Sequence, residues 1–118
     1  DIPAATTSLA KGAESEAVVS KGKPTGPRAH GVRGANDFGM FMAGNPDMAG
    51  NYGGYDGPAP PWNDELMHEY VFSVYALDVE SLGLKGVFSG ADARAAMEGH
   101  VLASGAVVGT YTLNPDLL

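Results

Sequence analysis

Glycine and proline crowd the first half of the chain, and this distribution limits the possible folds more than any other feature. The 118 residues include 17 glycines and 8 prolines, and most of both precede residue 62. Glycine adopts backbone conformations that other residues avoid, and proline removes a backbone N–H, so both favour turns over long helices. We therefore predict a loop-dominated first half, with a long surface loop over residues 11–33.

Length, composition and charge define the class of protein. A chain of 118 residues with 44% hydrophobic and 18% charged residues is expected to fold as one small domain, residues 1–118, with its own core. The net charge of −7 repels a phosphate backbone, so nucleic acid is not expected as a partner.

Membrane spans, metals and cofactors are not expected from the sequence. No stretch approaches the roughly 20 apolar residues that cross a bilayer, and residues 1–10 lack a signal pattern, so we expect a soluble chain in either cytoplasm or periplasm. The chain has no cysteine and three histidines, which are dispersed without zinc-site spacing. No function is assigned to His30 or His100.

Residues 68–78 show the clearest strand pattern, rich in aromatic and β-branched side chains. With a period of two, His68 and Tyr70 share one face and Glu69 lies on the other. Both faces are mostly apolar, which predicts a central strand.

Two further elements and a group of anchors are expected. Ser89 resembles a helix N-cap with Asp92 at the third helical position, and helical spacing continues to His100 and Val101, so we predict a helix ending near residues 104–105. A last strand is predicted over residues 106–113. The side chains expected to pin the first-half loop to a core are Phe38, Met40, Phe41 and Met48.

Residues 54–61, with the sequence GYDGPAPP, are followed by His68-Glu69-Tyr70 and by Tyr75-Ala76-Leu77-Asp78. Together they resemble the second conserved block of the phosphatidylethanolamine-binding protein (PEBP) family, in its bacterial, Raf kinase inhibitor-like branch. Ala59 stands where bacterial relatives often have cysteine, and Glu69 where a basic residue or histidine is common. Further segments that resemble bacterial members are residues 23–27, 36–38, 88–92, 99–103 and 109–111.

The resemblance implies a mainly β fold with peripheral helices (α+β), in which a large antiparallel sheet packs with a smaller one. It also implies a shallow anion pocket, with one wall formed by Gly57, Pro60 and Pro61, and with His68 and Tyr70 projecting into it. Family domains carry an earlier Asp-Pro-Asp-x-Pro loop and a strand with a second histidine, which this sequence lacks. We therefore expect a domain without its amino-terminal strands and first conserved motif, whose pocket is completed by a complementary amino-terminal segment.

The residues themselves leave two interpretations of His68 and Tyr70. Two positions along one strand place them roughly 6–7 Å apart, so both can reach one small oxyanion and donate hydrogen bonds to it. In the alternative, His68 is a strand-end histidine satisfied by a carbonyl and Tyr70 is a core residue. Asp56 and Asp64 lie near the expected pocket and could favour a cation instead.

The expected function is non-enzymatic binding of a phosphate-like anion or phosphorylated head group, with no catalytic residue. The resemblance adds inhibition of a protein kinase or protease. The alternatives are a hydrolase of a phosphoester or related substrate, in which His68 acts as general acid or base, and an interaction protein whose edge strands pair with a complementary chain.

Overall fold

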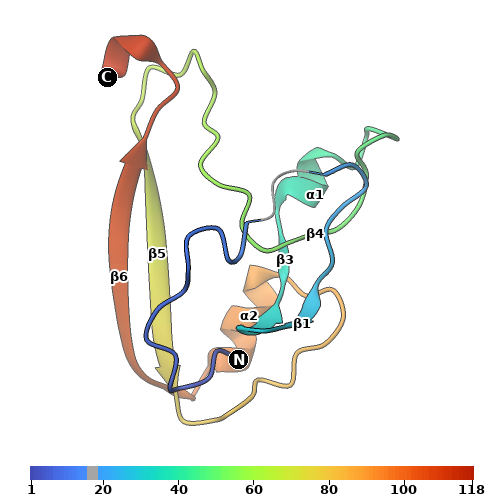
Figure 1. The fold of residues 1–118 in the computed structure, drawn as a ribbon, viewed down its shortest axis with the longest axis vertical. Coiled ribbons are helices and arrows are strands. Elements are labelled where there is room, and N and C mark those ends of the chain that lie inside the picture. Colours follow the sequence, from blue (N-terminus) through green and yellow to red (C-terminus); the bar gives the residue numbers. More distant parts are fainter. Residues whose placement is uncertain (16–18) are drawn as a thin grey trace. The chain divides into compact units, whose positions relative to one another are not determined.

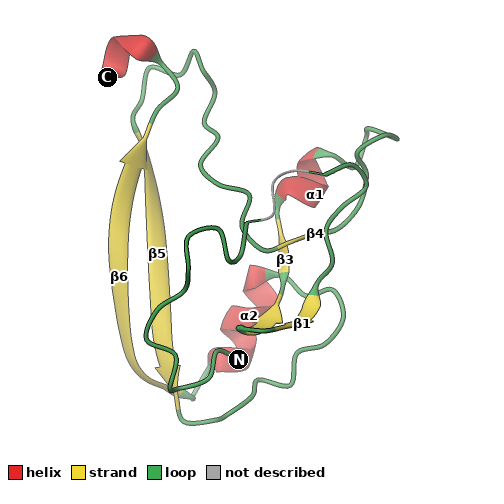
Figure 2. Ribbon diagram, viewed as in Figure 1, coloured by secondary structure: helices red, strands yellow, loops and turns green. Residues whose placement is uncertain are grey.

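A computed structural model describes residues 1–15 and 19–118, and these residues form two compact units. The first unit comprises residues 1–56 and 79–100, and the second comprises residues 57–78 and 101–118. Figure 1 traces the elements along the chain, and Figure 2 shows how much of it is loop. The strands form three two-stranded antiparallel sheets.

The first unit contains two short antiparallel pairs of strands. β1 (Gly26–Arg28) pairs with β2 (Gly31–Arg33), and β3 (Ala35–Asn36) pairs with β4 (Tyr52–Gly53). The predicted loop over residues 11–33 is therefore wrong at its carboxyl end. Pro27 lies within β1, and a two-stranded sheet tolerates its missing N–H because each strand has an outer edge.

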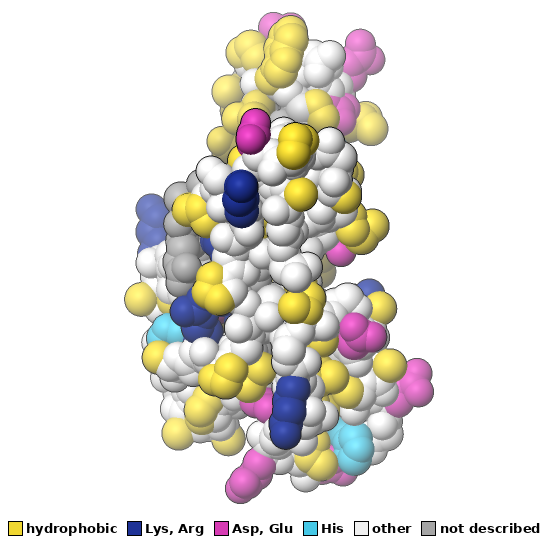
Figure 3. Space-filling view, turned by 90° about the vertical axis from the view of Figure 1, so that its right-hand side faces the viewer, with side chains coloured by type: hydrophobic (Ala, Val, Ile, Leu, Met, Phe, Trp, Pro, Cys, Tyr) yellow, Lys and Arg dark blue, Asp and Glu magenta, His cyan; other side chains and the backbone are white. Residues whose placement is uncertain are grey.

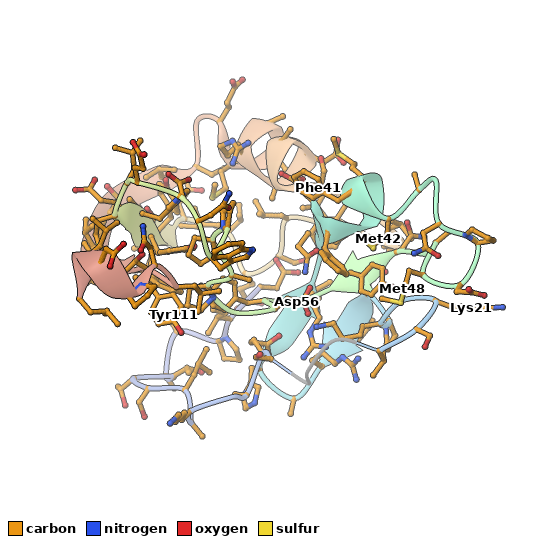
Figure 4. All side chains as sticks on the ribbon, turned by 90° about the horizontal axis from the view of Figure 1, so that it is seen from above. Lys21, Phe41, Met42, Met48, Asp56 and Tyr111 are labelled. Carbon is orange, nitrogen blue, oxygen red and sulfur yellow. The ribbon has the colours of Figure 1, made fainter. Side chains whose placement is uncertain are left out.

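Tyr52 is the centre of the first unit, since it has no exposed surface. Its ring meets that of Phe38 edge to face with centroids 4.8 Å apart, and its hydroxyl donates to the carbonyl of Met48 at 2.6 Å. Phe38 is thus confirmed as an anchor. Met40 and Phe41 are 76% and 79% exposed, so their prediction as anchors is wrong. Because α1 (Phe38–Phe41) is a single turn, only one of its sides can pack against Tyr52. Phe41, which is labelled in Figure 4, is exposed.

Two buried cations in the first unit are paired with acids. Lys23 forms an ion pair with Asp56, whose other carboxylate oxygen accepts from Asn36 Nδ2 at 2.7 Å. Arg33 Nε donates to Glu14 Oε2 at 2.7 Å. Burying a charge is costly unless it is paired, so these contacts allow the loop-rich first unit to enclose Lys23 and Arg33. They also fix Asp56, the residue that precedes Gly57.

α2 (Gly90–Met97) begins as predicted and ends earlier. Ser89 Oγ accepts from the Asp92 N–H at 3.1 Å, and Asp92 Oδ2 accepts from the Ser89 N–H at 2.8 Å, which makes a reciprocal capping box. The predicted continuation to residues 104–105 is wrong. Gly99 has φ = +77°, a left-handed conformation that ends the helix two residues after Met97.

The second unit is a long ribbon of two strands, followed by the short 3₁₀ helix η1 (Pro115–Leu117). β5 (His68–Leu77) pairs with β6 (Val101–Tyr111), from His68 opposite Tyr111 to Leu77 opposite Val101. The strand predicted over 68–78 is confirmed, and the last strand begins five residues before its predicted start at 106.

The prediction that β5 is central is wrong for the described residues, because β5 pairs there with β6 alone. Apolar side chains on both faces of the ribbon are exposed instead of being covered by a second layer. Those exposed by half or more of their surface are Val71, Phe72, Val74, Leu102, Val107 and Val108. The apolar pattern suits burial on both faces, but the covering strands that it implies are not among the described residues.

The mainly β class with few helices is confirmed, although the described strands form three small sheets in place of one large sheet and one smaller sheet. On the face drawn in Figure 3, Lys and Arg side chains stand apart from one another among hydrophobic and acidic ones. In the part of the chain that the structure describes, no helix has the length and apolarity to cross a membrane.

Candidate anion-binding site

His68 and Tyr70 occupy the first and third positions of β5 and share one face of the ribbon, as the period-two pattern predicts. Both are partly buried, whereas Glu69 between them is exposed. Across the ribbon, His68 lies opposite Tyr111 (labelled in Figure 4) and Tyr70 lies opposite Gly109. Gly109 has no side chain and an added Cβ there would meet no atom within 4 Å, so this side of Tyr70 stays open.

The loop that precedes β5 carries the other three predicted site residues. Gly57 has φ = +89°, Pro60 is buried and Pro61 is exposed. The carbonyl of Pro61 accepts from the Asp64 N–H at 3.2 Å, which starts a chain of contacts toward His68. All five predicted residues thus belong to the second unit. The structure sets His68 and Tyr70 on one strand face, whereas Gly57 and Pro60 are linked to them only by the backbone that continues to Pro61.

Asp64 is a site residue that the sequence analysis missed in this role. Its Oδ2 lies 2.7 Å from His68 Nε2, and its Oδ1 accepts from the Leu66 N–H at 2.9 Å. The hydrogen bond from His68, followed by that from Leu66, holds the pKa of Asp64 below its usual range. The sequence signal for this contact is the Asp-x-x-x-His spacing. That spacing brings the carboxylate to the imidazole only when the intervening residues form a turn.

Asn114, which follows the end of β6 that pairs with His68, fixes Asp64 at the same end of the ribbon. Asn114 Nδ2 donates to the carbonyl of Asp64 at 2.9 Å, and its backbone N–H donates to Thr112 Oγ1 at 3.0 Å. Its Oδ1 accepts from the Asp116 N–H at 3.0 Å. The candidate site therefore joins the turn before β5 to the residues after β6, which sequence proximity does not reveal.

The two interpretations of His68 can now be compared with its surroundings. The described partner of the imidazole is a carboxylate rather than a backbone carbonyl, and the ring is 36% exposed. Asp56 and Asp64, considered as cation ligands, are each engaged with a donor: Asp56 with Lys23 and Asn36, and Asp64 with His68. Within the described residues, no three His, Asp or Glu side chains come together as a metal-binding group.

A separate cavity of about 180 Å³ lies in the first unit. Polar side chains of Glu14, Arg28, His30 and Arg33 line it beside Ile2 and Leu9. It shares no residue with the predicted pocket, and His30, to which no function was assigned, lines it together with two arginines.

The described residues define a β-rich module whose candidate site sets a histidine and a tyrosine on one face of a hairpin, with an aspartate against the histidine. The family model described as phosphatidylethanolamine-binding protein matches residues 1–112. The chain therefore belongs to the phosphatidylethanolamine-binding protein family.

Three curated relatives illustrate the similarity. The UPF0098 protein of Pyrococcus horikoshii is 42% identical over 82 residues, which are 70% of this chain and 34% of the relative. That of Aquifex aeolicus is 38% identical over 89 residues, 75% of this chain and 44% of the relative. That of Pyrococcus abyssi is 37% identical over 82 residues, 70% of this chain and 38% of the relative.

The chain spans less than half the length of these relatives. They include archaeal proteins, so the similarity extends beyond the bacterial branch. No solved structure matched the chain.

Proposed function

We propose that this chain binds a phosphate-like anion or a phosphorylated head group without catalysing a reaction. The observation that supports this most directly is the placement of His68 and Tyr70 on one face of β5, where both are partly exposed. An imidazole N–H and a phenol O–H are both donors for oxyanions. The matched family is named for binding a phospholipid, which supports a phosphorylated ligand.

The test is an NMR titration with phosphate and with phosphoethanolamine, followed through the His68 ring signals in the parent and through backbone amide signals in the parent and in every variant. We expect saturable shifts in the parent, loss of binding in His68→Ala and weaker binding in Tyr70→Phe, which removes only the hydroxyl. His30→Ala is the matched control, because His30 lines the cavity of the first unit. Binding that is lost in His30→Ala and kept in His68→Ala would move the anion to that cavity and overturn the proposal.

Regulation of a protein kinase or protease is the role that such binding would serve, as the family resemblance suggests. The hydrolase alternative predicts turnover of p-nitrophenyl phosphate that disappears in His68→Ala. We expect no turnover in the parent. Turnover with that dependence would replace binding by general acid–base catalysis as the function.

The exposed ribbon supports a second candidate, an interaction protein that pairs with a complementary chain. Apolar side chains on both faces of β5 and β6 are exposed, and β6 contains no charged residue that would oppose pairing at its outer edge. Sedimentation of the parent should then show association that Val108→Lys abolishes and Glu69→Lys does not. Monomeric parent protein at all concentrations, with no added chain bound, would remove this candidate.

A further inference from the structure

The partner of His68 is itself an oxyanion. Asp64 Oδ2 lies 2.7 Å from Nε2, the distance expected of a charge-assisted hydrogen bond. A carboxylate therefore stands where a phosphate oxygen would stand if it bound to the same nitrogen. This position is the starting point for an inference that rests on the proposed function of the site.

Asp64 is held in place by contacts that do not involve His68. Its Oδ1 accepts from Leu66, its N–H donates to the Pro61 carbonyl, and its own carbonyl accepts from Asn114. An Asx turn of this kind fixes the aspartate side chain over its own backbone. The carboxylate is thus positioned beside the imidazole by the fold and is not a mobile surface charge.

This arrangement changes what His68 can offer an anion. When the imidazole is neutral and donates through Nε2 to Asp64, Nδ1 carries no proton and cannot donate to a ligand. When it is protonated, the Asp64 carboxylate balances its positive charge. In both states an anion meets a nearby negative charge, and the repulsion grows with the charge of the ligand.

We infer that Asp64 is a specificity-determining residue, which competes with the ligand for His68 and makes the site prefer singly charged over doubly charged phosphate esters. A phosphodiester carries one negative charge at neutral pH, whereas a phosphomonoester carries nearly two. The carboxylate therefore penalises the monoester more strongly.

The experiment measures the affinities of dimethyl phosphate and methyl phosphate at pH 7.5 in low salt, by NMR titration of the parent and of Asp64→Asn. Removing one charge about 4 Å from the ligand should raise affinity about fivefold for the diester and about 25-fold for the monoester. Asparagine keeps an oxygen that can accept from Leu66, so the turn should persist. Asp64→Ser provides a second neutral variant that can make the same bond.

Glu69→Gln is the matched control. It also removes one negative charge, but from the residue next to His68, whose side chain lies on the opposite face of β5. Its monoester-to-diester affinity ratio should equal that of the parent. If Asp64→Asn and Asp64→Ser bind both esters with the parent's ratio, the inference is wrong while anion binding stands. If no variant binds either ester, the proposed function itself fails, and the inference fails with it.

Discussion

At Gly57 the backbone takes φ = +89°, although a Cβ added there would meet no atom within 4 Å. Substitution by alanine should therefore cost conformational energy and cause no clash. We expect Gly57→Ala to lower the free energy of unfolding by about 1–2 kcal/mol, as measured by urea denaturation.

Gly105→Ala is the control for this prediction, since an added Cβ is equally unobstructed there and the strand backbone of β6 suits alanine. Gly105→Ala should leave the free energy of unfolding unchanged or raise it slightly. Equal effects of the two substitutions would show that the left-handed backbone at Gly57 does not make glycine favourable there for stability.

The Asp64 carboxylate should report its contact with His68 through its titration. In the folded chain its pKa lies below the ordinary value of 3.8, first because of the His68 hydrogen bond and second because of the Leu66 N–H. The stabilisation from these contacts is fully present above about pH 3.8 and is lost as pH falls through the lowered pKa. His68→Ala should raise the pKa of Asp64 toward its ordinary value in an NMR titration of carboxyl carbons.

Asp92 supplies the internal comparison, because its pKa is lowered by Ser89 and not by histidine. Its titration should be unchanged in His68→Ala. An unchanged pKa of Asp64 in the same spectra would mean that the two side chains do not interact in solution.

The sequence predicts single residues well where a regular period governs them. His68 and Tyr70 share a face because strands alternate, and that part of the site needed no knowledge of the fold. The contact between Asp64 and Asn114 could not be predicted, because it joins residues 50 positions apart. Only the pairing of β5 with β6 brings them together.

Among the elements, α2 depends on its first turn. Ser89→Ala removes the oxygen that accepts from the Asp92 N–H, and loss of such a cap costs roughly 1 kcal/mol. We expect faster amide exchange at the start of α2 and a partial rise in the pKa of Asp92. The Ser89 backbone N–H, the first cause of the lowered pKa, remains in this variant, whereas the hydroxyl, the second cause, is removed.

Ser104→Ala, an exposed position within β6, is the matched control and should leave both readouts unchanged. Unaltered exchange in Ser89→Ala would show that α2 is held by its other contacts.

The two boundaries of α2 show why one end of an element is easier to predict than the other. Its start carries a specific hydrogen-bonding signal in Ser89 and Asp92. Beyond its end, His100 and Val101 continue the helical spacing by coincidence, although the left-handed Gly99 has already ended the helix. The error in α2 displaced the predicted start of β6 as well.

For the whole molecule, we expect unequal protection of backbone amides. An isolated two-stranded ribbon is marginal in water, whereas the surroundings of Tyr52 exclude solvent completely. In dilute protein, amides of β5 and β6 should exchange faster than those of β4. Protection of the ribbon should rise with protein concentration or on addition of a complementary chain.

Slow exchange of the ribbon in a demonstrably monomeric sample would contradict this expectation.

Fold class was predictable from the strand patterns and the family resemblance. The size of the sheets was not, because apolar patterning on both faces of β5 indicates that a strand is suited to burial but does not identify the residues that bury it.

The alternation of β5 also offers a practical route to observing the site. The chain has no cysteine, so Glu69→Cys would introduce a single reactive thiol. That thiol would be adjacent in sequence to both His68 and Tyr70 but would project from the opposite face of β5. A fluorophore or spin label attached there could follow ligand binding without occupying the ligand's place.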